Sequence, residues 1–296
     1  MNLYHSPAYV AAATEWDTTR KAAWVADSLA DRPIAGVGIV APAPATPDEL
    51  ARVHDRTYIR AVRSGEPASL AGSNGIGWDA RLFDAVAAST GGAVAAALDA
   101  LATGGNAGSL SSGLHHARRG TGAGFCTFNG LALAADAAIR AGARGVLVLD
   151  LDAHCGGGTA SILGASAEVV GLDVATSPFD TYDPPADWTL DLVTSAERYL
   201  PTIRARLDAL DARGATFDLV LHNAGMDPFA GCRIGGLAGI DAEVLGERER
   251  LVFAWARTRG VPVAFVLAGG YASTEAGQAE LVELHRATIA AAAGAG

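Results

Sequence analysis

Short apolar runs alternate with longer segments of helical periodicity along most of this chain. Runs such as 146–149 and 263–267 are apolar at every position, as expected of strands buried on both faces. Segment 79–101 spaces its apolar residues three and four apart, which predicts a helix. Such alternation is typical of a parallel sheet covered by helices on both faces. The sequence therefore predicts a three-layer α/β/α fold.

The predicted elements cover nearly the whole chain. Strands are expected at residues 34–40, 107–110, 145–152, 167–174, 217–222 and 262–267. Helices are expected at residues 47–53, 58–64, 79–101, 129–141, 190–210, 241–258 and 275–291. The glycine-rich stretch 64–77 is predicted to be a long surface loop. A chain of 296 residues with 50% hydrophobic content can bury one large core, so we expect a single domain over residues 1–296.

Composition argues against several classes of protein. The chain has 22 Lys and Arg against 32 Asp and Glu, a formal charge of −10, which lacks the basic footprint of a nucleic-acid binder. Three cysteines cannot all pair, which fits a reducing cytoplasm and three small buried side chains. The chain has no basic, apolar leader at its start and no apolar run of ~18 residues, so we expect a cytoplasmic protein outside the membrane. The alanine-rich composition suggests a bacterial source.

One predicted strand ends in Asp150-Leu-Asp152-Ala-His154, followed by a patch of glycines. Alternate side chains of a strand share one face, so these two carboxylates and the imidazole are expected to point the same way. Their convergence beside buried aliphatic residues is unfavourable unless a cation or a hydrogen-bond network satisfies them. Carboxylate and imidazole ligands suit a divalent transition metal. The alternative is an ordinary solvated turn between a strand and a helix.

Other polar residues follow other predicted strands. Asp227 follows strand 217–222, Tyr271 follows strand 262–267, and the adjacent His115 and His116 follow strand 107–110. Ligands of open parallel sheets bind at the carboxyl ends of the strands, so these residues are expected to meet there.

These residue types can divide the work of amide hydrolysis. Two carboxylates and one imidazole leave room on a metal for water and a substrate oxygen. A histidine pair can take a proton from the water and give one to a leaving amine, and a tyrosine hydroxyl can stabilise an oxyanion. Taken singly, the histidines are equally explained as exposed loop residues, and Gly269-Gly270-Tyr271 as a turn.

In combination and order, the motifs resemble those of the zinc-dependent histone deacetylase family, including its bacterial deacetylase-like and acetylpolyamine amidohydrolase branches. The similarity runs from about Tyr4 to Tyr271. The motifs that carry it are Val53-His-Asp-Arg-Thr-Tyr58, His115-His116-Ala117, Gly124-Phe125-Cys126-Thr-Phe-Asn129, Asp150-Leu-Asp152-Ala-His154, Gly225-Met-Asp227, Gly235-Gly-Leu237 and Gly269-Gly-Tyr271.

The resemblance implies an arginase-like fold with a largely parallel eight-stranded sheet, and an acylated amine such as acyl-lysine or acetylpolyamine as substrate. Asp152, His154 and Asp227 would hold Zn²⁺, with Fe²⁺ or Co²⁺ also possible. His115 and His116 would be the acid/base pair, with Asp150 behind His115, and Tyr271 the oxyanion donor. The resemblance assigns the substrate tunnel to Gly124 and Phe125, its floor to Cys126, and its opposite wall to Phe179 or Tyr182.

Several positions depart from the family pattern. Cys155 replaces a second histidine, and Gly157 replaces the Asn or Asp that steadies the second histidine of the pair. His116 is therefore expected to lack its partner, a loss that commonly costs ~10–100-fold in activity. Cys232 stands where the family has Asp, and Ala268 where Glu is common. Gly171 is expected to replace a serine at a structural K⁺ site beside Asp150, which leaves that site open to question.

Three functions remain after the sequence alone. The first is a zinc amidohydrolase that removes an acyl group from an amine. The second is a degenerate relative that binds an acylated ligand without turnover, because His116 is unoriented. The third is a ureohydrolase with two manganese ions, which would require further bridging carboxylates. The oligomeric state stays open.

Overall fold

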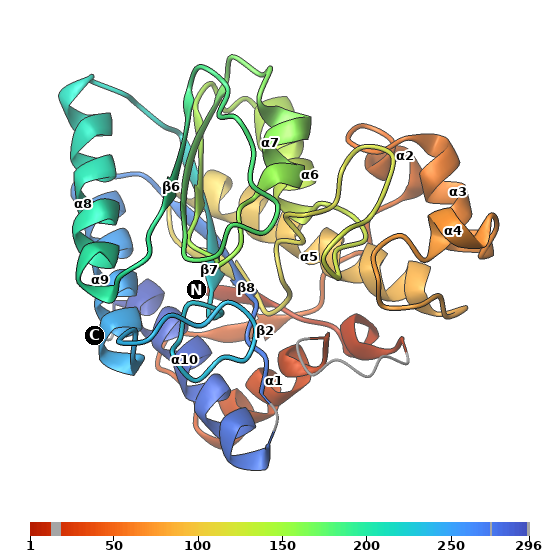
Figure 1. Cartoon of the computed structure of the whole chain (residues 1–296), viewed down its shortest axis with the longest axis horizontal. Helices are drawn as coiled ribbons and strands as arrows, with labels where there is room; N and C mark the ends of the chain where they lie inside the picture. The colour runs from red at the N-terminus through yellow and green to blue at the C-terminus, as the bar shows by residue number, and fades with distance from the viewer. Residues whose placement is uncertain (13–18, 273, 295–296) are drawn as a thin grey trace.

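The computed structural model describes residues 1–12, 19–272 and 274–294, and its centre is one eight-stranded, fully parallel sheet. The strand order is β2-β1-β3-β8-β7-β4-β5-β6 (Figure 1). The strands are β1 (Asn2–Tyr4), β2 (Gly38–Val40), β3 (Ala107–Ser109), β4 (Val146–Asp150), β5 (Val169–Ala175), β6 (Trp188–Leu192), β7 (Leu219–Gly225) and β8 (Val263–Ala268).

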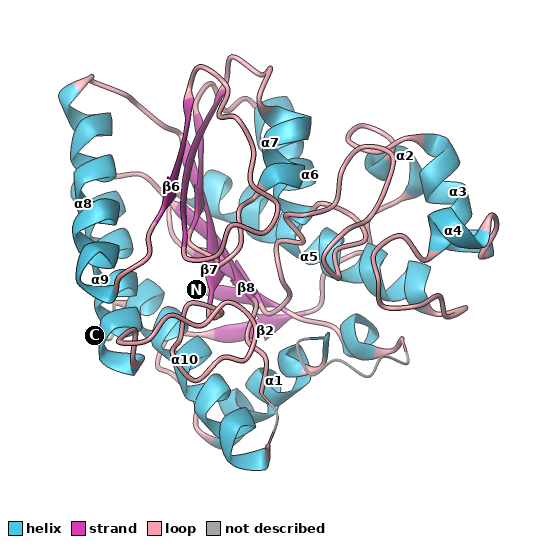
Figure 2. Ribbon diagram, in the orientation of Figure 1, coloured by secondary structure: helices cyan, strands magenta, loops and turns pink. Residues whose placement is uncertain are grey.

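Helices cover both faces of the sheet (Figure 2). The helical elements are η1 (Pro7–Val10), α1 (Lys21–Asp31), α2 (Pro47–Leu50), α3 (Arg56–Ser64), α4 (Ala68–Ala71), α5 (Leu82–Thr103), α6 (Gly130–Arg140), α7 (Gly157–Leu163), α8 (Ala196–Ala212), α9 (Ala242–Thr258) and α10 (Glu275–Ala293). Helices α5 and α6 pack on one face, whereas α8 packs on β5 and contacts α9, which with α10 and α1 belongs to the opposite layer. The predicted three-layer α/β fold with a parallel eight-stranded sheet is confirmed.

The central strand β4 shows why two cores form. Val146 and Val148 belong to the hydrophobic cluster under α5 and α6, while Leu147 and Leu149 belong to the cluster under α8, α9 and α10. All five residues of β4 are buried. Side chains alternate between the two faces of a strand, so a strand between two helical layers must be apolar at successive positions.

Helix α5 is long and apolar enough to pass a length and composition test for crossing a membrane. However, 61% of its apolar window is buried inside the protein, and it packs on α6, β1, β3 and β8. It is the core helix of one layer.

The prediction of one helix over 190–210 was wrong. Residues Trp188–Leu192 form β6, which pairs with β5, and the helix begins only at Ala196. The Trp188 ring lies over Gly171, where an added Cβ would come within 2.0 Å of it. Local periodicity cannot detect this pairing, because the partner strand supplies the hydrogen bonds of β6.

Several short elements were missed by sequence reasoning. Strand β1 and helices α1 and α7 were not predicted, α4 lies inside the predicted loop 64–77, and only Gly38–Val40 of the predicted strand 34–40 is a strand. These elements are short or polar, so tertiary contacts rather than local patterns decide them.

Candidate metal centre and active site

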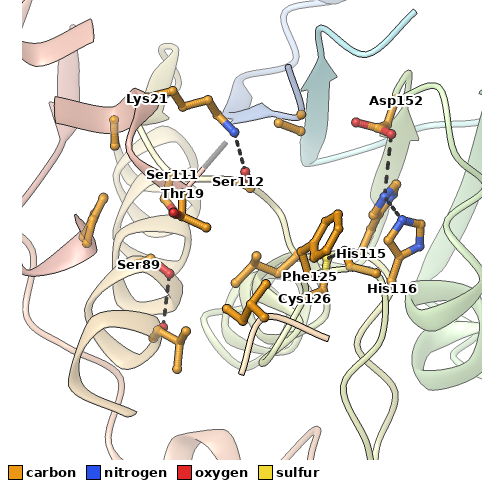
Figure 3. A pocket seen from close by; sticks show the side chains of 18 of the residues that line it. Thr19, Lys21, Ser89, Ser111, Ser112, His115, His116, Phe125, Cys126 and Asp152 are labelled. Atoms are coloured by element: carbon orange, nitrogen blue, oxygen red, sulfur yellow. Dashed lines mark hydrogen bonds and ion pairs between the residues drawn. The ribbon is translucent and has the colours of Figure 1, made fainter. Parts of the chain in front are cut away.

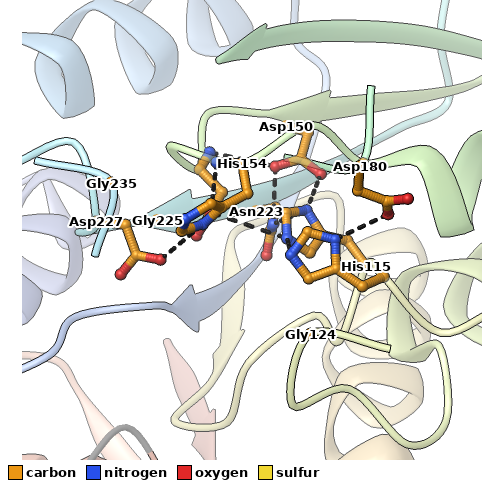
Figure 4. A network of polar contacts seen from close by, with 12 residues as sticks. His115, Gly124, Asp150, His154, Asp180, Asn223, Gly225, Asp227 and Gly235 are labelled. Atoms are coloured by element: carbon orange, nitrogen blue, oxygen red, sulfur yellow. Dashed lines mark hydrogen bonds and ion pairs between the residues drawn. The ribbon is translucent and has the colours of Figure 1, made fainter. Parts of the chain in front are cut away.

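The ends of β4 and β7 bring three buried polar residues together. The two strands are neighbours in the sheet, with Asp150 paired to Asn223. Asp152 and His154 follow β4, Asp227 follows β7, and their ligand atoms all lie within 4.8 Å of one another. Figure 4 shows His154 beside Asp227. Nδ1 of His154 is 3.0 Å from Asp152 Oδ1 and 3.2 Å from Asp227 Oδ2.

The electrostatics of this cluster fit a bound cation. Burial and the neighbouring Asp152 carboxylate raise the pKa of Asp227. Burial disfavours a charge on His154, but its contacts with the two carboxylates raise its pKa to about 10. Two buried carboxylates that share one imidazole therefore attract positive charge strongly. A divalent ion held by two carboxylate oxygens and one imidazole nitrogen is the chemistry this donor set suits.

Beside this cluster, His115 is anchored by two strand ends. Its Nδ1 lies 2.7 Å from Asp150 Oδ2, while Asn223 Nδ2 donates to Asp150 Oδ1 at 2.8 Å. A carboxylate only accepts hydrogen bonds, so Nδ1 of His115 carries a proton. This leaves Nε2 of His115 facing Nε2 of His116 at 3.1 Å.

The expectation that His116 lacks a partner was wrong. Nδ1 of His116 lies 2.9 Å from Asp180 Oδ2, and Asp180 also accepts hydrogen bonds from the Arg118 guanidinium at 2.5 Å and from the amide of Gly158 at 3.2 Å. Asp180 adopts φ 61°, a left-handed conformation that Asp tolerates better than most residues. Its carboxylate arrives from the loop after β5 instead of from position 157.

Gly157 is the reason that this carboxylate fits. A Cβ added at Gly157 would lie 2.4 Å from the backbone oxygen of Asp180 and 2.8 Å from its Oδ1. Neither distance is compatible with a side chain unless the loop moves. Gly157 and Asp180 therefore act together, the first leaving the space that the second fills. Cys155 is buried nearby, where its amide donates to Phe179 O.

The pKa values of the two histidines are shifted in opposite directions. Burial alone would lower the pKa of His115, but Asp150 raises it to about 9. Burial and the charge on His115 lower the pKa of His116 to about 4. Near neutral pH the pair therefore holds one positive charge, and the two Nε2 atoms share a single proton.

The pocket beside these groups is lined by residues from distant parts of the chain. Figure 3 shows Lys21 and Ser112 on one side, the histidine pair with Asp152 on the other, and Phe125 between them. Gly124 and Cys126, which the resemblance assigns to the substrate tunnel, also line this pocket, as do Asp227, Ala268 and Tyr271. The ring centroids of Phe125 and Tyr271 are 6.0 Å apart.

Phe179, not Tyr182, faces the histidines. The Phe179 ring packs edge-on against His116 and His154, with centroids 5.0 and 5.8 Å away. Tyr182 instead packs on Trp188 and donates to Asp173 Oδ2.

Cys232, another departure from the family pattern, lies at the edge of the cluster formed by Asp152, His154 and Asp227. Its Sγ is 3.9 Å from Asp227 Oδ1 and 3.2 Å from Ile234 O. Burial raises the pKa of this thiol to about 12, so it is neutral near neutral pH.

The residue beside Asp150 on β5 is Asp173, not Gly171. Gly171 pairs with Val148, two positions earlier along β4. Asp173 is buried, and its Oδ1 has no hydrogen-bond partner among the described residues, while Oδ2 accepts from the Gly156 amide at 2.7 Å. Burial and the Asp150 carboxylate raise the pKa of Asp173 well above its usual value. The expectation that Gly171 replaces a serine at a K⁺ site stays a prediction, and the structure adds Asp173 as the residue of β5 paired with Asp150.

Sequence reasoning missed Asn223, Lys21, Asp173 and Asp180. Asn223 and Asp173 lie near the carboxyl ends of strands, so the rule that found Asp227 could also have found them. Lys21 is buried in α1, a helix that was not predicted, and donates to Ser112 at 2.8 Å. Asp180 lies in a loop where no local pattern marks it.

Known proteins are similar to this chain both in sequence and in fold. The histone deacetylase domain matches residues 14–286. An uncharacterized protein of Picosynechococcus sp. is 34% identical over 236 residues, which cover 77% of this chain and 78% of the relative. Histone deacetylase 2 of Arabidopsis thaliana is 31% identical over 176 residues, 56% of this chain but only 44% of the plant protein. Acetoin utilization protein AcuC of Bacillus subtilis is 37% identical over 131 residues, 40% of this chain and 34% of that protein.

Solved structures extend the comparison to the whole fold. An acetylpolyamine aminohydrolase from Burkholderia pseudomallei superposes with a TM-score of 0.81 at 20% identity, covering 100% of this chain and 99% of the other. The HDA15 HD domain gives the same TM-score at 18% identity, with 99% and 89% covered. The chain therefore belongs to the histone deacetylase family and is an enzyme of the deacetylase and amidohydrolase class.

Proposed function

We propose that this protein is a zinc-dependent amidohydrolase that removes an acyl group from an amine. The observation that carries the proposal is the buried Asp152, His154 and Asp227 cluster, which shares one pocket with the His115–His116 pair. Zn²⁺ suits three such ligands with an open position, and Fe²⁺ or Co²⁺ suits them too. Bound there, the ion would polarise the acyl carbonyl and lower the pKa of a water molecule.

The histidine pair moves protons. Each Nδ1 is committed to a carboxylate, Asp150 or Asp180, so chemistry takes place at the two Nε2 atoms. The single proton that they share can go to the nitrogen of the leaving amine, and the lone pair that remains can accept a proton from the attacking water. Asp150 and Asp180 fix the ring orientations and stabilise the charge on the pair.

In this proposal Tyr271 donates a hydrogen bond to the developing oxyanion. It lines the same pocket as the metal cluster and packs near Phe125. Burial and the carboxylates of Asp227 and Asp152 raise the pKa of its hydroxyl, which keeps that hydroxyl protonated as a donor. Gly124, Phe125 and Cys126 line the path of the acylated chain in this proposal.

The substrate class is an acylated amine such as acyl-lysine or an acetylated polyamine. The likeness to the acetylpolyamine aminohydrolase and to a histone deacetylase supports this class. The formal charge of −10 also favours the approach of a cationic amine.

We also propose a potassium ion beside Asp150. Asp150 and Asp173 lie side by side on β4 and β5, and Asp173 Oδ1 has no hydrogen-bond partner among the described residues. A monovalent cation bound to both carboxylates would offset their repulsion and satisfy this oxygen.

The test is hydrolysis of a fluorogenic acyl-lysine panel and of acetylated polyamines by the purified protein. Activity should disappear with a chelator and return with Zn²⁺, and elemental analysis should find one metal per chain. Metal binding and ligand binding without turnover of any acylated amine would overturn the proposal and identify a degenerate binder. Two manganese ions per chain would identify a ureohydrolase, although the described residues offer one cluster of three such ligands.

A further inference from the structure

A second buried polar network lies behind the candidate metal ligands. Arg248 and Glu249, neighbours on α9, are both completely buried and form an ion pair with Nη2 of Arg248 2.5 Å from Glu249 Oε1. Glu249 Oε2 is 3.1 Å from Nε2 of His222, which lies on β7 and is also fully buried. None of these residues contributes a side chain to the pocket described above.

The guanidinium of Arg248 reaches the two loops that carry the metal ligands. Its Nη1 donates to the carbonyl of Leu151 at 3.1 Å and to the carbonyl of Gly225 at 2.6 Å. Leu151 directly precedes Asp152, and Gly225 stands two residues before Asp227. Nη2 also lies 3.7 Å from Met226 Sδ, which is next to Asp227.

Tyr199 completes the network from α8. Its hydroxyl donates to Leu151 O at 3.3 Å and accepts from Arg248 Nη1 at 3.1 Å. Burial alone would raise the pKa of Glu249, but Arg248 and His222 lower it to about 2, so the ion pair stays charged. In this network of four side chains, Arg248, Glu249, His222 and Tyr199, the two opposite charges of the ion pair face each other.

Stability alone does not explain this arrangement. A buried ion pair is often no more stabilising than well-packed hydrophobic side chains of similar volume. A planar guanidinium does, however, offer several donors in a fixed geometry, which hydrophobic residues and lysine do not. Here it sets the separation of the carbonyls beside Asp152 and Asp227.

We infer that Arg248 is a positioning residue, which ties the ends of β4 and β7 together so that Asp152 and Asp227 face one metal ion before it binds. The inference rests on the proposed metal site. Preorganised ligands bind a metal more tightly because less of the binding free energy is used to order the loops.

The experiment measures zinc affinity by competition with a chromophoric chelator, and the d–d spectrum of the Co²⁺-loaded protein. The variant is Arg248→Lys, which keeps the charge but has a single nitrogen in place of the three that here divide the contacts with Glu249 and with the two carbonyls. The expected result is a Kd for zinc raised by about 10–100-fold, as for other residues behind metal ligands, with altered Co²⁺ bands. The matched control is Arg206→Lys, because Arg206 also forms a two-point ion pair, with Asp191, but far from the cluster.

A zinc Kd and a Co²⁺ spectrum equal to the wild type would overturn the inference, even if the urea midpoint of Arg248→Lys fell. Should that variant not fold, Glu249→Gln carries the test, because it removes the carboxylate that holds Nε and Nη2 of Arg248 and so loosens the guanidinium on the two carbonyls. A rise of up to ~10-fold in Kd supports the inference, and no rise overturns it. Failure of the wild type to bind zinc would instead contradict the proposed function. The failure of the inference about Arg248 and the failure of the proposed function therefore give different results.

Discussion

Two buried polar clusters flank the same strand ends, and they differ in charge balance. Behind the strands, Arg248 and Glu249 neutralise each other, and each is held by further hydrogen bonds. In front of them, Asp152 and Asp227 share the single imidazole of His154, with the Asp150 carboxylate close behind. The first cluster is complete within the chain, whereas the second has an excess of negative charge.

The difference in charge balance suggests different roles for the two clusters. A satisfied buried network fixes a geometry, and an unsatisfied one of the same depth is a site for something that the chain does not supply. In the proposed function the front cluster would hold the cation beside the substrate, and in the further inference the rear cluster would hold the front one in place. This distinction can be tested by changing one group at a time.

The largest effect is expected from Asp227→Ala. Removing this carboxylate should abolish stoichiometric zinc binding and lower kcat/KM by roughly 10³-fold or more, because several kcal/mol of charge stabilisation depend on the metal. Elemental analysis and steady-state kinetics measure both. Asp191→Asn, at an ion pair on the sheet edge, is the control and should leave both unchanged. Full metal content in Asp227→Ala would show that the cluster is not the metal site.

The ion pair of Arg248 and Glu249 should make the free energy of unfolding fall in acid. The pKa of Glu249 is about 2 in the folded protein against an ordinary 4.5, so its contribution to stability is complete above about pH 4.5 and lost as the pH falls towards 2. Between about pH 5 and pH 2 this group alone should cost the wild type about 3 kcal/mol of unfolding free energy. Urea titrations at several pH values measure the loss.

Two variants isolate the part of this loss that belongs to Glu249. Glu249→Gln should lose about 3 kcal/mol less over the same range, while Glu247→Gln, on the exposed side of α9, should behave as the wild type. Equal acid sensitivity of Glu249→Gln and the wild type would contradict a depressed pKa of Glu249.

A smaller effect is expected at Asp180. Asp180→Ala leaves Nδ1 of His116 without its acceptor and should lower kcat by about 10–100-fold, with little change in KM because Asp180 lies behind His116. Asp180→Asn retains an acceptor oxygen and should lose less. Gly157→Ala should mimic Asp180→Ala, since its Cβ pushes against Asp180. A kcat for Asp180→Ala equal to that of the wild type would show that Asp180 does not support catalysis.

The smallest effect concerns potassium. Replacing KCl by tetramethylammonium chloride at equal ionic strength should lower the thermal midpoint and change kcat by a few-fold, because Asp150 and Asp173 then repel each other without a counter-ion. Asp173→Asn removes one of the two charges and should be insensitive to the exchange. A wild-type protein that is indifferent to the cation would contradict a site at Asp173.

Much of this architecture was predictable because it follows from local patterns. Fully apolar runs identified β4 and β8, and the rule that parallel sheets bind ligands at the carboxyl ends of their strands placed Asp152, His154 and Asp227 in one neighbourhood. The helix expected at 190–210 failed in its first part because Trp188–Leu192 pairs with β5, whose partner residues lie 17 positions earlier in the chain. Short strands such as β1 have the same dependence on a partner.

The sequence by itself determined the residues that can hold a metal and move protons, since those are properties of side-chain types at strand ends. Only the tertiary structure decided what stands behind them. Asp180 reaches His116 from a separate loop because Gly157 leaves room, and Arg248 reaches Leu151 and Gly225 from α9. Such partners meet through chain packing over long sequence separations, and no local spacing records the distance between two loops.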